Sequence, residues 1–182
     1  VGSDTATRST TYGGTSGATP FGAGAAALAR NFLRGNLSTV DPGQVYAFLI
    51  MSGQNFSSPA TDNNKGAGLI KLYVGDTSMQ WGSVLVSPNS SVNVTMDASF
   101  WVNGTNFIDV GIWWPQGLSH TNIDLRLNRP NGTTAASSLS TRSVFEKVRV
   151  EGTGLPSGAW KIRITNTGSV TQRVYWSRRF ST

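Results

Sequence analysis

Short segments in which apolar and polar residues alternate, separated by turn signals, fill the chain from about residue 73 onward. The clearest alternation lies at 92–96, 123–127, 148–150 and 161–165. Such alternation places apolar side chains on one face of a strand and polar side chains on the other. Gly, Pro and Asn stand between these segments, for example at 129–132. The pattern predicts an all-β antiparallel sandwich or jelly roll.

Two aromatic-rich segments complete this predicted sandwich. Residues 107–114 are almost continuously apolar, which is typical of a central strand, and 173–177 would form the last strand. Trp113 and Trp114 offer two explanations, a platform on which sugars stack or part of the core. Core packing is the favoured explanation, because it is the usual fate of large apolar side chains in a sandwich.

The first 72 residues lack this alternation, and a serine there lies just before an Ala-rich segment. The sequence runs Gly14-Thr15-Ser16-Gly17-Ala18-Thr19-Pro20, and Gly and Ala then dominate. Pro20 suits the first turn of a helix, whose unpaired amides would face Ser16. A serine acts as a nucleophile only when it is exposed, activated by a base and served by an oxyanion hole. Ser16 is therefore a candidate nucleophile, and Gly14 and Thr15 would shape the turn around it.

A second helix is predicted directly after this segment. Asp41 would be its N-cap, Pro42 its first residue, and Gln44 the partner that closes a capping box. Gly53 would end the helix.

These two segments resemble the subtilisin-like serine proteases (subtilases). Their serine signature, Gly-Thr-Ser-x-Ala-x-Pro followed by small residues, is filled without a mismatch from Gly14 to Gly24, and 65–70 is similar to the segment that closes their catalytic domain. The resemblance implies that 1–72 is the C-terminal third of an α/β catalytic domain with a parallel sheet. Residues 73–182 would then be an appended β-sandwich domain. The alternative is a Gly/Ser/Thr-rich loop that matches by accident.

The same resemblance implies a serine endopeptidase that hydrolyses protein or peptide substrates. Ser16 would be its nucleophile, and the oxyanion and turn-shaping residues would be Gly14, Thr15 and Ser16, with the Ser16 backbone N–H as an oxyanion donor. Its catalytic Asp and His would come from an upstream segment or a companion chain, because the one histidine, His120, lies in a polar loop and fits a surface residue. The Ala-rich helix would expose an apolar face without such a partner, so we expect 1–72 to belong to a nicked enzyme or an excised piece. The chemistry would need no cofactor.

The second part of the chain resembles the prepeptidase C-terminal and P-type domains of secreted bacterial proteases. The resemblance rests on 124–132, on Glu146 and on 155–162. In some relatives an acidic pair at the first of these places helps to bind calcium. Arg126 stands where the second acid would be, which disfavours a metal there, although structural calcium elsewhere is compatible with the sequence.

Charge supports a different class of function. The net charge is +6, and eight basic residues from Arg142 onward face only Glu146 and Glu151. The excess would suit an acidic polymer or surface, or else it marks the solvated face of a sandwich, which is the favoured explanation. The alternative to the protease is thus a non-catalytic binding or assembly module, built on the basic aromatic sandwich.

The remaining expectations concern partners and location. No nucleic-acid motif is present, so no nucleic-acid partner is expected. No segment is long and apolar enough to span a membrane. The absence of cysteine fits a secreted or extracytoplasmic protein.

Overall fold

The computed structural model describes residues 2–3, 9–10, 14–54, 66–73, 78–96 and 107–180. Two helices precede the sandwich: α1 (Gly14–Arg34) and α2 (Pro42–Ser52). Four two-residue strands form small antiparallel pairs, β1 (Gly2–Ser3) with β2 (Ser9–Thr10) and β3 (Gly53–Gln54) with β4 (Leu69–Ile70). The longer strands are β5 (Gln80–Val86), β6 (Ser90–Thr95), β7 (Phe107–Trp113), β8 (Ile123–Asn128), β9 (Thr134–Ser138), β10 (Phe145–Glu151), β11 (Lys161–Asn166) and β12 (Gln172–Phe180).

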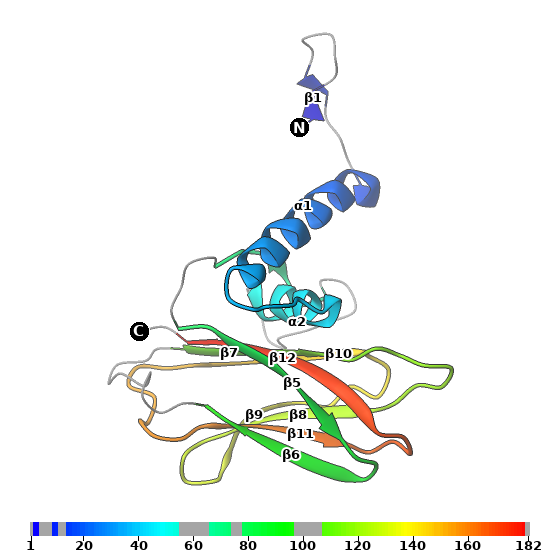
Figure 1. Ribbon diagram of the computed structural model, residues 1–182. Coiled ribbons are helices and arrows are strands. Elements are labelled where there is room, and N and C mark those ends of the chain that lie inside the picture. Colours follow the sequence, from blue (N-terminus) through cyan, green and yellow to red (C-terminus); the bar gives the residue numbers. More distant parts are fainter. Residues whose placement is uncertain are drawn as a thin grey trace.

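The longer strands build two stacked antiparallel sheets of four strands each (Figure 1). The sheet in the order β10-β7-β12-β5 lies against the helices, and we call it the helix-side sheet. The sheet in the order β6-β11-β8-β9 lies on the other side of the sandwich, and we call it the far sheet. The predicted all-β sandwich is confirmed, and 107–113 is a central strand as expected.

The core lies between the two sheets and follows the alternation of the sequence. Ile108, Val110 and Ile112 of β7 are fully buried, and Ile162 and Ile164 of β11 meet them from the far sheet. Trp114 is also fully buried, and its indole Nε1 donates to the Thr121 carbonyl at 2.9 Å. Core packing, rather than sugar stacking, is therefore the role of Trp114.

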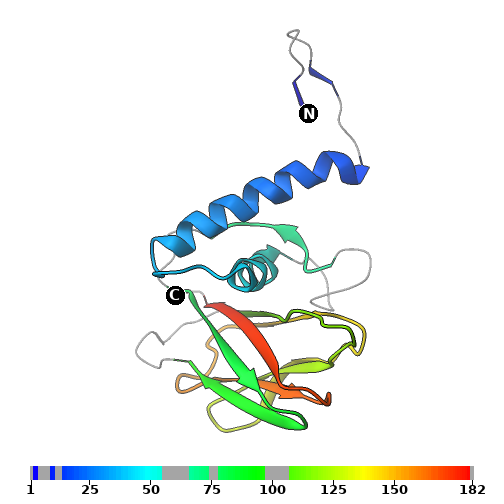
Figure 2. The same cartoon turned by 45° about the vertical axis from the view of Figure 1, so that its right-hand side comes forward.

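Helix α2 lies directly on the outer face of the helix-side sheet (Figure 2). Gly111 permits this contact, because a Cβ atom there would lie 2.5 Å from the Met51 amide nitrogen. A Cβ atom at Gly43 would lie 2.3 Å from ring carbons of Tyr175. The absence of two side chains thus lets the helix backbone approach the strands.

The predicted start of α2 is confirmed, but the side chain of Gln44 has a different hydrogen-bond partner from the predicted one. The side chain of Asp41 caps the helix by accepting from the Gly43 amide at 3.1 Å, and Pro42 is the first residue. Gln44 does not close a capping box: its Nε2 donates to the Gly82 carbonyl of β5 at 2.7 Å. The side chain that was expected to cap the helix instead attaches it to the sheet.

Helix α1 contacts the rest of the chain mainly through its C-terminal half. Ala29 and Leu33 are fully buried against Phe48 and Met51. The N-terminal half extends away from the sandwich (Figure 1), and the Phe21 side chain there is 72% exposed. The exposed apolar face predicted for this helix is therefore present.

The predicted α/β domain is wrong for the described residues. The paired strands around the helices are antiparallel and only two residues long, and α2 lies on the sandwich rather than on a parallel sheet. The expected division into 1–72 and 73–182 stays a prediction. None of the helices among the described residues is long and apolar enough to cross a membrane.

Candidate functional site

The serine segment lies inside a helix and not in a loop before one. Helix α1 begins at Gly14, whose φ of 76° is in the left-handed region, so Ser16 belongs to the first turn and Pro20 lies in the interior. Thr15 and Ser16 are exposed, and the Thr15 carbonyl accepts from Thr19 Oγ1 at 2.8 Å. Among the described residues, no side chain that could act as a base hydrogen-bonds to Ser16, and its role as a nucleophile stays a prediction.

The other residues with catalytic or metal-binding chemistry are dispersed. His120 is exposed in the β7–β8 connection, as predicted for a surface histidine. Across the part of the chain that the structure describes, no three His, Cys, Asp or Glu residues come together in a way that would hold a metal ion. Structural calcium therefore has no assigned site.

The outer face of the helix-side sheet is closed by the helical layer. Tyr46 of α2 stacks on Trp113 with ring centroids 4.7 Å apart. Tyr175 donates from its hydroxyl to Asp41 Oδ2 at 2.6 Å. Burial, reinforced by this hydrogen bond and by the Asp41 charge, raises the pKa of Tyr175 to about 12. These contacts use the aromatic side chains of this face internally, so the face has no room for a ligand where α2 lies.

Lys147 fastens a second segment to the same face. Its ammonium group donates to the Gly53 carbonyl and, at 3.1 Å, to the Ala67 carbonyl. The side chain is almost fully buried, and this burial lowers the pKa of Lys147 to about 8 even though Asp109 opposes the shift. Lys147 thereby joins β10 to Gly53, the first residue of β3, and to Ala67, two residues before β4.

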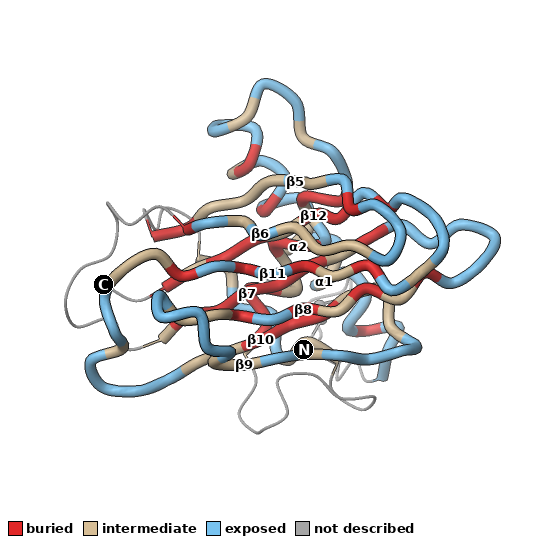
Figure 3. The backbone as a smooth tube through the Cα atoms, turned by 90° about the horizontal axis from the view of Figure 1, so that it is seen from below, coloured by how far each residue is buried: buried red, intermediate tan, exposed pale blue. Residues whose placement is uncertain are grey.

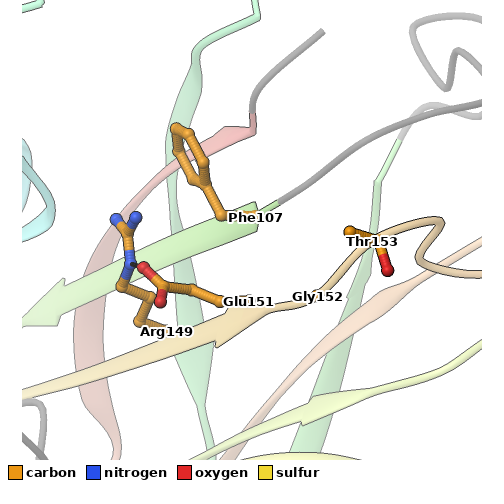
Figure 4. A pocket seen from close by; sticks show the side chains of 5 residues that line it. All are labelled: Phe107, Arg149, Glu151, Gly152 and Thr153. Atoms are coloured by element: carbon orange, nitrogen blue, oxygen red, sulfur yellow. Dashed lines mark hydrogen bonds and ion pairs between the residues drawn. The ribbon is translucent and has the colours of Figure 1, made fainter.

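Beyond α2, this face carries a small hollow of about 320 Å³ (Figure 4). Phe107, Arg149, Glu151, Gly152 and Thr153 line it. The Arg149 guanidinium is already used, because it contacts Asp109 Oδ2 at 2.7 Å and also binds Glu151. The Cζ atom of Arg149 also lies 4.4 Å from the centroid of the Phe107 ring. The two charged residues that line the hollow, Arg149 and Glu151, are thus paired with each other.

The outer face of the far sheet is different, because neither of the two described helices, α1 and α2, packs on it. Figure 3 shows this sheet from below: buried residues alternate with exposed or half-buried ones along β11 and β8, and the residues of β6 are half-buried or exposed. Strand pairing arranges the outward residues in rows that cross the sheet. The middle row consists of Asn93, Arg163, Arg126 and Ser137, all exposed. One flanking row consists of Thr95, Lys161, Asn128 and Thr134. The other consists of Ser91, Thr165 and Asp124.

We call these three rows the polar face. Hydroxyl and amide groups dominate it, and three cations lie near its centre: Arg126, Arg163 and Lys161. Ser91 Oγ and Thr165 Oγ1 are 2.8 Å apart, and Thr134 Oγ1 donates to Asn128 Oδ1 at 3.1 Å. Arg163 Nη2 also donates to Ser91 Oγ at 3.4 Å, and Asn122 donates to Asp124 Oδ1 at 3.2 Å. The polar face is therefore a flat hydrogen-bonding surface with a positive centre.

Sequence reasoning found the strands of this face but not the face itself. Alternation predicted that Arg126 and Arg163 point outward, and the favoured explanation was an ordinary solvated surface. Their juxtaposition depends on the pairing of β8 with β11, which are separated in sequence by β9 and β10. The weak signal that was available is the replacement of an acid by Arg126 in the Asp-Leu-Arg-Leu segment.

No family model and no curated protein matches this chain. Among solved structures, the Yersinia pseudotuberculosis-derived mitogen is similar over 56% of this chain and 84% of its own, with 10% identity and a TM-score of 0.46. A carbohydrate-binding module, CBM36 in complex with calcium and xylotriose, is similar over 56% and 88%, with 15% identity and a TM-score of 0.34. TmCBM61 in complex with β-1,4-galactotriose is similar over 59% and 83%, with 9% identity and a TM-score of 0.35. At such scores these likenesses say nothing about what this chain binds.

The resemblance to subtilases is contradicted by these findings. No family model supports it, and helix α2 lies on an antiparallel sandwich instead of a parallel sheet. The expected serine endopeptidase activity is wrong on the same grounds, and a companion chain carrying Asp and His has no support. The signature at 14–24 therefore lies in a helix of small residues, whereas the alternative weighed against the protease was an accidental match in a Gly/Ser/Thr-rich loop.

Proposed function

We propose that this chain is a non-catalytic binding module and that its ligand lies on the polar face of the far sheet. The observation that carries the proposal is the difference between the two outer faces of the sandwich. Helix α2 covers the helix-side sheet, and Gly43 and Gly111 permit that close contact. The far sheet has no such cover and presents exposed Asn93, Arg126 and Arg163.

The scaffold suits binding because it fixes the outward side chains without help from loops. The inward residues of the same strands, such as Leu125, Ile162 and Ile164, are fully buried in the core. The outward residues of β8 and β11 therefore stand on backbones that are paired on both sides, and those of the edge strands β6 and β9 on backbones that are paired on one side. A rigid surface binds at lower entropic cost than a flexible one.

The location stays part of this proposal. A secreted or extracytoplasmic module agrees with the absence of cysteine from the sequence. Binding to extended, hydrated polymers outside the cell is a function that a flat polar face could serve.

The test is to map ligand contacts on the protein by NMR. The ¹⁵N-labelled chain is titrated with a panel of soluble polymers, both neutral and anionic, and amide shifts are assigned to the two sheets. We expect shifts on β6, β11 and β8, with the helix-side sheet as the internal control. Shifts that cluster on β10 and β7 around the hollow instead, or no saturable binding by any polymer, would refute the proposed surface.

A further inference from the structure

We propose that the polar face recognises an acidic polysaccharide, whose acid groups pair with Arg126, Arg163 and Lys161 while its hydroxyls bond to the surrounding amides and hydroxyls. This inference rests on the proposed function, because it names the ligand class of the same face.

The first support is a pair of like charges placed directly opposite each other. Arg163 on β11 is the register partner of Arg126 on β8. Partners in an antiparallel pair have Cβ atoms about 5 Å apart, and like charges at such positions destabilise the sheet. The guanidinium of Arg163 contacts Ser91 Oγ of β6 at 3.4 Å, which lies on the side away from Arg126. The two like charges are therefore neighbours on the polar face, and an anion that binds both would relieve their repulsion.

The second support is the scarcity of negative charge around these cations. Within the described residues, none of the ion pairs involves Arg126, Arg163 or Lys161. Asp124 is the one carboxylate in the three rows, and the Asn122 amide donates to it at 3.2 Å. Asp109 is occupied on the other sheet by Arg149. The cations of the polar face are thus available to a ligand rather than used for internal pairing.

The third support concerns the kind of anion. Arginine presents a planar fork of donors that matches a carboxylate or sulfate in two parallel hydrogen bonds. The polar face surrounds its cations with Asn93, Asn128, Ser137 and other groups that both donate and accept, as sugar hydroxyls require. No aromatic residue points outward from the described rows, and single-stranded nucleic acids depend on such residues for stacking. A polyanion rich in hydroxyls therefore fits better than a nucleic acid.

The experiment compares four probes on one protein: polygalacturonate, dextran sulfate, neutral dextran and oligo(dT). Binding is measured by isothermal titration calorimetry at low and moderate salt, and shifts are mapped by NMR. We expect at least one of the two acidic polysaccharides to bind, more weakly as salt rises. Binding of polygalacturonate would identify carboxylate as the acid group, and binding of dextran sulfate would identify sulfate.

The variants test which cations are responsible. The double substitution Arg126→Gln/Arg163→Gln should weaken binding by about tenfold or more, since charged hydrogen bonds are removed from the contact. Lys161→Gln should weaken it less, because lysine lacks the two-donor fork. Arg173→Gln is the matched control, since it removes the same charge from an exposed position on β12 of the helix-side sheet. Thermal unfolding of every variant verifies that each one is folded.

The outcomes separate this inference from the proposed function. Equal or tighter binding of oligo(dT), or an unchanged affinity in the folded double variant, would overturn the acidic polysaccharide. Binding of neutral dextran alone, with shifts on β6, β8 and β11, would also overturn it but would leave the binding module intact. Failure of every probe to shift the polar face would overturn both.

Discussion

At the scale of single residues, Arg126 and Arg163 show a conflict between stability and binding. Their side chains stand opposite each other across β8 and β11 with no carboxylate between them. We expect Arg126→Gln to increase the free energy of unfolding by about 0.2–1 kcal/mol, because it removes a like-charge pair. Urea denaturation at low salt measures this change.

Arg173→Gln provides the comparison, with an expected change within about 0.5 kcal/mol. The gain from Arg126→Gln should also shrink as salt screens the repulsion. A loss of stability in Arg126→Gln at low salt would contradict the repulsion on which the argument depends.

Glu146 is a second residue whose environment has a measurable effect. It is fully buried, and burial raises its pKa to about 6 although Ser138 and Ser140 donate to it. A raised pKa means that the folded chain holds this proton more tightly than the unfolded chain. The stabilisation is therefore complete below about pH 4.5 and is lost as pH rises through about 6.

We expect Glu146→Gln to remove this pH dependence. The difference in unfolding free energy between the natural chain and the variant should change by on the order of 2 kcal/mol between pH 4 and pH 7. Denaturant titrations of both proteins at several pH values give the difference directly. A difference that stays constant over this range would show that the carboxyl group titrates normally.

At the scale of elements, the contact of α2 with the helix-side sheet depends on Gly111. A Cβ atom at this position would lie 2.5 Å from the Met51 amide nitrogen and 3.0 Å from the Ala47 carbonyl oxygen. Gly111→Ala should therefore lower the free energy of unfolding by roughly 1–3 kcal/mol through overpacking.

Gly24→Ala is the matched control for this substitution. Gly24 lies in α1 with no neighbouring atom within 4 Å of the added Cβ, so the change should raise stability by about 0.5–1 kcal/mol through helix propensity. Thermal unfolding followed by far-UV circular dichroism compares the two. Equal effects of the two alanines would mean that α2 moves away from β7 at little cost.

The helices and strands also show which structural features local sequence patterns could predict and which they could not. Local patterns were sufficient for the strands and for the start of α2, because alternation and the Asp41-Pro42 cap act within a few residues. They failed at α1, which begins at Gly14 and includes Ser16 and Pro20 although Gly, Thr, Ser and Pro are poor helix formers. They also gave Gln44 the wrong partner, since its real acceptor, Gly82, is 38 positions away. Features set by long-range contacts, including the Arg126–Arg163 pair, were beyond local patterns.

At the scale of the whole molecule, side-chain contacts join the helical layer to the helix-side sheet of the sandwich. Tyr46 stacks on Trp113, and Lys147 binds the carbonyls of Gly53 and Ala67. We expect α2 to unfold together with the sandwich in a single transition. Tryptophan fluorescence reports on the sheets and ellipticity at 222 nm reports largely on the helices, so the two denaturation curves should coincide.

This measurement also tests the division at residue 72 that the sequence suggested. Two separated transitions, with helical signal lost first, would support the division. Hydrogen exchange adds a local control, because amides of α2 should be protected as strongly as those of β7, while the N-terminal half of α1 should exchange faster.

The uncovered far sheet also has a consequence for how such a chain changes over evolutionary time. Along β8 and β11, alternate positions divide cleanly into core residues such as Leu125 and Ile164 and outward residues such as Arg126 and Arg163. Substitutions at outward positions leave the core untouched, so ligand preference can drift there without loss of the fold. The helix-side sheet lacks this freedom where α2 lies, because residues such as Gly111 are enclosed on both sides. Substitutions that change ligand preference should therefore accumulate on the far sheet, while the residues of the helix-side sheet under α2 change little.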